Sequence, residues 1–296
     1  MIPIEKHLKE YLDYLEIEKN RSPKTRANYE RYLKEFIAKT KIKSPEAITD
    51  DVVRNFRIVL ARKNIKKITQ SYYAIAIRNF LKYLVKRGIK TLAPDRIELP
   101  KIARRQIEIP EYKDLERLLA APEGNSLKTL RDRAILETLF STGLRISELC
   151  SLDRYLNLDR GEISIRGKGE KIRLVFLSDQ AKKTIKEYLN KRTDAEKSLF
   201  ISLTKSKNPR VIGTITPRAI QRLVNFYAKK GGVMSNVSPH KLRHFFATDL
   251  LINGADLRSV QELLGHSNIS TTQIYTHLTN KELKEVHRAF HGKRRG

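Results

Sequence analysis

Apolar residues recur every three or four positions through most of the first ninety or so residues, which is the spacing of amphipathic helices. Ser22 and Pro23 form an N-cap followed by proline at the first helical position, and an apolar helical stripe comes after them. Another helix is predicted after Pro45, and a further one through residues 71–88, which a glycine ends. This pattern predicts a small helical domain over residues 1–92.

Three prolines interrupt the helical spacing after this domain. Pro94, Pro100 and Pro110 stand in a stretch with little periodicity of its own, so we expect an extended linker over residues 93–110. Beyond the linker, helical spacing resumes at residues 111–121 and 129–143.

The period changes in the segment GEISIRGKGEKIRLVFLS, which covers residues 161–178. Apolar and polar residues alternate on either side of the sequence Gly-Lys-Gly-Glu, which predicts a β-hairpin. Helical spacing returns from Gln180 to the end of the chain, with breaks at residues 208–209 and 231–232. We therefore expect a second domain over residues 111–296 that is mostly helical with one small sheet.

Charge narrows the range of partners. The chain has 296 residues, is 40% hydrophobic and carries a net charge of +27, with 26 basic and 12 acidic side chains in residues 1–105 alone. A composition of this kind can bury a core. Because both halves are strongly basic, the excess favours binding to a long phosphate backbone over a protein that is merely soluble and basic.

Cysteine usage and apolar runs bear on the compartment. Cys150 is the single cysteine, so no intramolecular disulfide and no thiolate zinc cluster can form. The N-terminus lacks the apolar core of a signal peptide, and no run is long enough to span a membrane. We expect a cytoplasmic protein.

The segment SPHKLRHFFATDLL places cations at the start of a helix. Ser238 is a good N-cap, so His240, Arg243 and His244 lie near a helix N-terminus, where backbone N–H groups favour a phosphate. A zinc site on the two histidines competes with this reading, but Lys241 stands where the metalloprotease pattern has glutamate. We expect His244 to pack in the core.

The segment LLGHSNISTTQIYTHL contains a second group of polar residues. Ser270 and Gln273 form a capping box, which predicts that Tyr275 lies in the following helix and His266 in the preceding loop. Taken alone, a tyrosine of this kind is most often a surface or core aromatic. The histidines and arginine nearby in the chain favour a functional role.

Two further cations follow glycines. In FSTGLRISELCSL, Arg145 begins a helix and either forms a salt bridge with Glu148 or binds a phosphate as a bidentate fork, while Cys150 packs as a small hydrophobe. Lys168 is flanked by glycines at the hairpin tip, so it is either a solvated turn residue or reaches a ligand. The P-loop pattern is absent.

The motifs GLRISEL, GKGEK, HKLRH and LLGHSNISTTQIYTH, in this order, resemble the tyrosine recombinase family, and most closely its Xer type. The N-terminal segment SPKTRANYERYLKEF resembles the family's core-binding domain. The resemblance implies a mainly α fold with a small β-sheet. A SAM-like helical DNA-binding domain and an α+β catalytic domain would form a C-shaped clamp on DNA.

The family pattern of site residues is an Arg, a hairpin Lys, His-x-x-Arg, a His or Trp, and a Tyr nucleophile. The positions that match this pattern here are Arg145, Lys168, His240, Arg243, His266 and Tyr275. Lys171 lies three residues from Lys168, and the register of the hairpin decides which of the two points inward.

The resemblance also implies the chemistry. Tyr275 would attack a DNA phosphodiester, form a 3′-phosphotyrosine and release a 5′-hydroxyl. The two arginines would neutralise the phosphate, and Lys168 would protonate the leaving oxygen. His240 would assist proton transfer with Tyr275, and His266 would hydrogen-bond the phosphate. No metal, ATP or other cofactor is required by this scheme.

The expected function is site-specific recombination of double-stranded DNA, most closely the resolution of chromosome dimers at a dif-like site. Four protomers, alone or with a paralogous recombinase, would act on two duplexes, and a DNA translocase could activate them. The segment 282–296 would dock on a neighbouring protomer through its apolar positions. The alternatives are an integrase or transposase of a mobile element with the same chemistry, and a non-catalytic DNA-binding paralogue.

Overall fold

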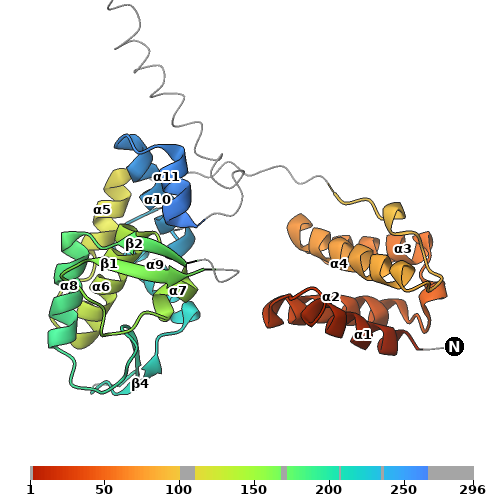
Figure 1. Cartoon of the computed structure of the whole chain (residues 1–296), viewed down its shortest axis with the longest axis horizontal. Coiled ribbons are helices and arrows are strands. Elements are labelled where there is room, and N and C mark those ends of the chain that lie inside the picture. The colour runs from red at the N-terminus through yellow and green to blue at the C-terminus, as the bar shows by residue number, and fades with distance from the viewer. Residues whose placement is uncertain (1–2, 101–110, 168–171, 207, 235–236, 266–296) are drawn as a thin grey trace, which may run out of the picture. The chain divides into compact units, whose positions relative to one another are not determined.

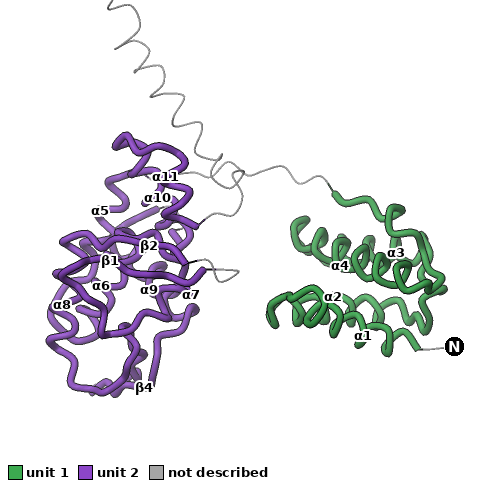
Figure 2. The backbone as a smooth tube through the Cα atoms, in the orientation of Figure 1, with its two compact units in different colours: residues 1–105 green, residues 106–296 purple. Residues whose placement is uncertain are grey.

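The computed structural model describes residues 3–100, 111–167, 172–206, 208–234 and 237–265. The chain divides into two compact units, residues 1–105 and residues 106–296 (Figures 1 and 2). Each unit has its own core of buried apolar side chains. Within the described ranges, no helix combines the length and the apolar character that crossing a bilayer requires.

The first unit is helical, as the spacing of apolar residues predicts (Figure 1). The hydroxyl of Ser22 accepts a hydrogen bond of 3.3 Å from the Thr25 amide and begins the second helix as expected. The sequence interpretation did not delimit the first helix, whose inward face is apolar. The elements are α1 (Ile4–Glu16), α2 (Pro23–Thr40), η1 (Pro45–Ala47), α3 (Asp50–Arg62), α4 (Lys67–Lys86) and η2 (Pro94–Arg96).

Aromatic side chains of α1 and α4 form the centre of this unit. The Tyr11 ring lies 5.3 Å from that of Phe80 and 5.2 Å from that of Tyr83, measured between centroids. Ile97, just after η2, is 2% exposed and belongs to the same core. Residues 94–97 therefore pack onto the helical unit instead of extending away from it. The reason is that Pro94 begins a 3₁₀ turn, where the sequence pattern suggested extended chain.

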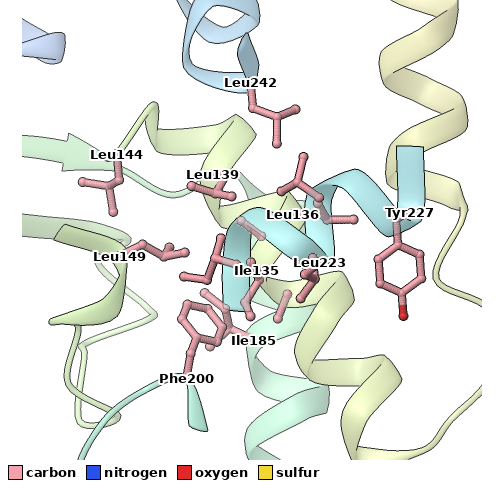
Figure 3. Packing of buried hydrophobic residues seen from close by; sticks show 14 of the residues in the cluster. Ile135, Leu136, Leu139, Leu144, Leu149, Ile185, Phe200, Leu223, Tyr227 and Leu242 are labelled. Carbon is pink, nitrogen blue, oxygen red and sulfur yellow. The ribbon is translucent and has the colours of Figure 1, made fainter. Parts of the chain in front are cut away.

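The second unit is built around α6, whose buried residues face several directions. This helix packs against α5, α8, α9 and α10. Figure 3 shows Ile135, Leu136 and Leu139 of α6 among the buried side chains of neighbouring elements. The helices are α5 (Tyr112–Ala120), α6 (Leu127–Thr142), α7 (Ile146–Cys150), α8 (Asp179–Asn190), α9 (Pro217–Lys230), α10 (Pro239–Ile252) and α11 (Leu257–Leu264).

The predicted hairpin is present. Strands β1 (Glu162–Arg166) and β2 (Ile172–Phe176) pair antiparallel, with Ile163 opposite Val175 on the buried face. The hairpin tip, residues 168–171, lies outside the described residues.

The expectation of a single small sheet is wrong. A second antiparallel pair, β3 (Ile201–Leu203) and β4 (Val211–Thr214), interrupts the run that was predicted to be helical. Strands of three and four residues offer too few alternating positions to be recognised from the sequence.

Helix α11 is held by a small apolar cluster of its own. Val260 and Leu264 pack with Ala247 and Leu251 of α10. Gly265 ends the helix in the left-handed conformation, with φ of +62°. Both the expected capping box at residues 270–273 and the expected docking segment 282–296 lie outside the described residues.

Candidate active site

Arg145 stands between two helices, as the sequence predicts. Gly143, with φ of +59°, ends α6, and Arg145 is the N-cap residue of α7. Glu148 accepts a hydrogen bond of 2.8 Å from the Arg145 amide and another of 2.9 Å from its Nη1. The predicted salt bridge with Glu148 is therefore confirmed. The Arg145 side chain remains 38% exposed, so it can also meet a ligand.

Arg243 is buried within the first turns of α10. The Ser238 hydroxyl accepts a hydrogen bond of 3.3 Å from the Lys241 amide and caps this helix as predicted. The Arg243 guanidinium donates from Nη1 to the Gly143 carbonyl at 2.7 Å and from Nη2 to the Leu264 carbonyl. The side chain thus ties the end of α6 to the end of α11.

His240 lies on the exposed side of the same helix start. Its ring packs edge-on against that of His244, with 4.5 Å between centroids, and His244 is buried as expected. Loss of water around the ring, followed by the positive charges of Arg243 and Arg145, lowers the pKa of His240. A neutral imidazole, able to accept a proton, is therefore favoured here at neutral pH.

Three arginines donate to three consecutive carbonyl oxygens at the end of α11. Arg173 Nε bonds to Leu263 at 2.9 Å, Arg243 bonds to Leu264, and Arg145 Nη2 bonds to Gly265 at 3.1 Å. The last carbonyls of a helix lack partners within the helix and carry its negative dipole end. Cations from three different elements satisfy them here.

Arg173 is a site residue that sequence reasoning missed. Its guanidinium also grips the Glu148 carboxylate, at 3.0 Å from Nη1 and 2.7 Å from Nη2. Burial disfavours the charged form of Glu148, but the bonds from Arg173 and Arg145 outweigh burial and lower its pKa to about 2. The strand pattern gave no signal for this, because Ile172 and Leu174 are its alternating apolar residues, and yet they face outward while Arg173 shares the inward face of Val175.

The described residues bring Arg145, His240 and Arg243 together, whereas Lys168, Lys171, His266 and Tyr275 lie outside them. Cys150, the last residue of α7, is half-buried against the core as expected, and burial raises the pKa of its thiol to about 11. Chemically, the site presents two guanidiniums and a neutral imidazole, which suits an oxyanion that exchanges a proton with a neighbouring group.

Comparison with protein families gives matches along most of the chain. Residues 111–282 match the model described as "Phage integrase family". Residues 8–88 match the model described as "Phage integrase, N-terminal SAM-like domain".

Individual relatives match over nearly the whole chain. "Tyrosine recombinase XerC" of Thermodesulfovibrio yellowstonii is 37% identical over 291 residues, which cover 96% of this chain and 96% of that protein. A crystal structure of XerA recombinase has a TM-score of 0.54 and 28% identity, covering 98% of this chain and 99% of that chain. A crystal structure of XerH site-specific recombinase bound to palindromic difH substrate, a post-cleavage complex, shares the fold. Its TM-score is 0.69 at 24% identity, covering 94% of this chain and 82% of that chain.

Proposed function

Because the chain belongs to the phage integrase family, we propose that it cuts and rejoins double-stranded DNA as a site-specific tyrosine recombinase of the Xer type. The XerC relative from Thermodesulfovibrio yellowstonii matches this chain over 96% of both lengths. The net charge of +27 suits a polyanionic substrate. The biological task that follows is the resolution of chromosome dimers at a dif-like site, a step of chromosome partition at cell division.

The observation that carries the catalytic assignment is the convergence of Arg145 and Arg243 on the end of α11. Their guanidiniums bond to the adjacent carbonyls of Gly265 and Leu264. From there the chain continues to His266 and, nine residues later, to Tyr275. A phosphotyrosine mechanism requires phosphate-binding arginines close to the nucleophile. Arg145 and Arg243 meet this requirement because they bond to the residues just before the segment that carries Tyr275.

In this mechanism the phenolic oxygen of Tyr275 attacks the phosphorus of one DNA strand. The bond to the 5′ oxygen breaks as the 3′-phosphotyrosine forms, and Lys168 or Lys171 gives the leaving oxygen its proton. His240, neutral at physiological pH, takes the phenolic proton. Arg145 and Arg243 offset the charge on the non-bridging oxygens, and His266 donates to one of them.

Rejoining is the same step in reverse, with a 5′-hydroxyl of the partner strand as nucleophile. The energy of the phosphodiester bond is kept in the phosphotyrosine, so the proposed cycle needs no external energy source. We infer a cytoplasmic protein acting as a tetramer on two synapsed duplexes. A paralogous recombinase and a DNA translocase are the candidate protein partners.

The direct test is covalent trapping on a nicked duplex that carries a dif-like site, followed by a denaturing gel. Wild type and Tyr155→Phe are expected to give a protein–DNA band, whereas Tyr275→Phe binds the duplex and gives none. Tyr155 is a matched control because this tyrosine is 75% exposed. An adduct with Tyr275→Phe would reject Tyr275 as the nucleophile, and no adduct with wild type would reject cleavage of this DNA.

A further inference from the structure

Arg173 is a buried cation in a strand whose neighbours face water. Its side chain is 8% exposed, while Ile172 is 63% and Leu174 is 48% exposed on the opposite face of β2. A guanidinium on the inward face of a two-stranded sheet is costly to desolvate unless its donors are satisfied. The contacts that it makes therefore indicate why it is there.

Those contacts join two other elements. Nη1 and Nη2 hold both oxygens of Glu148 in α7, and Nε holds the carbonyl of Leu263 at the end of α11. This is a bidentate fork on one side and a helix cap on the other, a combination that the planar guanidinium allows. Arg173 is thus the connection between the β1–β2 hairpin, α7 and the end of α11.

Glu148 passes this constraint on to Arg145. The same carboxylate accepts from the Arg145 amide and from Arg145 Nη1, so its position sets that of the Arg145 guanidinium. Arg145 in turn bonds to the carbonyl of Gly265, two residues after the carbonyl that Arg173 holds. The four groups form a closed ring of hydrogen bonds: Arg173, Glu148, Arg145 and the backbone at 263–265.

Gly265 adds independent evidence that Arg173 and the end of α11 are closely fitted. A Cβ placed on Gly265 would lie 2.9 Å from Arg173 Cδ and 3.3 Å from its Nε. The left-handed φ of +62° also excludes most side chains. The glycine lets the backbone approach the arginine closely enough for the Leu263 bond.

We propose that Arg173 is a positioning residue for DNA cleavage: it fixes the end of α11, where the chain continues to His266 and Tyr275, relative to Arg145. This inference rests on the proposed function. Arg173 is buried and does not itself meet the scissile phosphate. It acts by holding Arg145, through Glu148, and the root of the nucleophile segment, through Leu263, in one arrangement.

The test compares Arg173→Gln and Arg173→Lys with Arg258→Gln. Arg258 is a charge-matched control on α11, with a side chain 89% exposed and only a 3.9 Å ion pair to Glu262. The first measurement is the single-turnover rate of adduct formation on the nicked dif-like duplex at saturating protein. The second is the Kd for the same duplex, and the third is amide hydrogen exchange of residues 257–265 without DNA.

Arg173→Gln is expected to lower the cleavage rate by roughly tenfold or more, with the Kd changed by less than about threefold. The cleavage rate of Arg173→Lys should lie between those of Arg173→Gln and wild type, because a lysine keeps the charge near Glu148 but cannot bridge to Leu263. Exchange at the end of α11 should quicken in both variants and stay at the wild-type rate in Arg258→Gln.

Cleavage within about twofold of wild type in both Arg173 variants would overturn the inference. So would a rate loss seen only below saturating protein and matched by a weaker Kd, since that would make Arg173 a binding residue. If wild type itself forms no adduct, the proposed function fails, and the exchange measurement still decides whether Arg173 anchors α11. Unchanged exchange in Arg173→Gln would reject the anchor.

Discussion

The Arg243 guanidinium donates a hydrogen bond of 2.7 Å to the carbonyl of Gly143, one hundred residues earlier in the chain. Gly143 is the C-cap of α6 and stands two residues before Arg145, the N-cap of α7. The bond therefore fixes the end of α6 and the start of α7. The two proposed phosphate-binding arginines are therefore coupled through the backbone of one glycine. This relationship makes Gly143 a sensitive position.

Gly143→Ala should destabilise the second unit by about 2–4 kcal/mol. The methyl group would collide with the Phe246 ring, and the left-handed φ adds strain of about 1 kcal/mol. Gly88→Ala is the matched control, because Gly88 has φ of +73° and nothing near its added Cβ. We expect it to cost the first unit only about 1 kcal/mol. Chemical denaturation measures both, and equal losses at the two glycines would contradict the packing argument.

Glu148 should give the second unit an acid-sensitive stability. Because its folded pKa is lowered from 4.5 to about 2, the stabilisation is complete above pH 4.5 and is lost as the pH falls toward 2. It amounts to about 3 kcal/mol at most. Glu148→Gln should reduce the unfolding free energy at pH 7 and flatten its dependence on pH over that window. Equal pH slopes in the two proteins would show that other carboxyls control acid unfolding.

His240 should set the acid limb of the cleavage rate. Its pKa is lowered from 6.5, so the neutral base persists as the pH falls below that value, and the rate should decline only at lower pH. His240→Gln should cleave roughly 100-fold more slowly, without this limb. Single-turnover rates across pH 5–8 provide the check, with pH range chosen around the ordinary histidine value of about 6.5. A wild-type limb centred at or above 6.5 would contradict the assignment.

The roles of Lys168 and Lys171 can be distinguished with a DNA substrate whose leaving group is changed. A duplex with sulfur in place of the 5′-bridging oxygen releases a thiolate, which needs no proton. The variant that has lost the general acid, Lys168→Ala or Lys171→Ala, should cleave the ordinary duplex slowly and the sulfur duplex at nearly the wild-type rate. The other variant should show the same ratio as wild type on the two substrates. Rescue of neither variant would mean that neither lysine protonates the leaving oxygen.

The sequence allowed the local features of the site to be predicted, because each depends on neighbours close in the chain. The Ser238 cap, the glycine before Arg145 and the Arg145–Glu148 pair are all present, and each of them joins residues only a few positions apart. The hairpin was recognisable because five alternating positions stand on each side of its turn.

What could not be predicted depends on distant pairings. Arg173 meets Glu148, 25 residues earlier, and Leu263, 90 residues later, and no periodicity relates these positions. The short strands β3 and β4 gain their pairing from the surrounding unit and not from their own pattern. Ile97 likewise joined a core that three prolines gave no reason to expect.

The small apolar cluster that α11 shares with α10 affects how readily this helix detaches. A cluster of four buried and four partly buried apolar residues, shared with α10, and a few guanidinium bonds hold this helix, whereas α6 is embedded in the main core of the unit. Detaching α11 exposes little apolar surface, so it is a sub-global opening that costs far less free energy than unfolding the unit. Such local openings occur in microseconds to seconds. The proposed arrangement of Arg145, Arg243 and the end of α11 can therefore be assembled and dismantled many times during the lifetime of the folded domain.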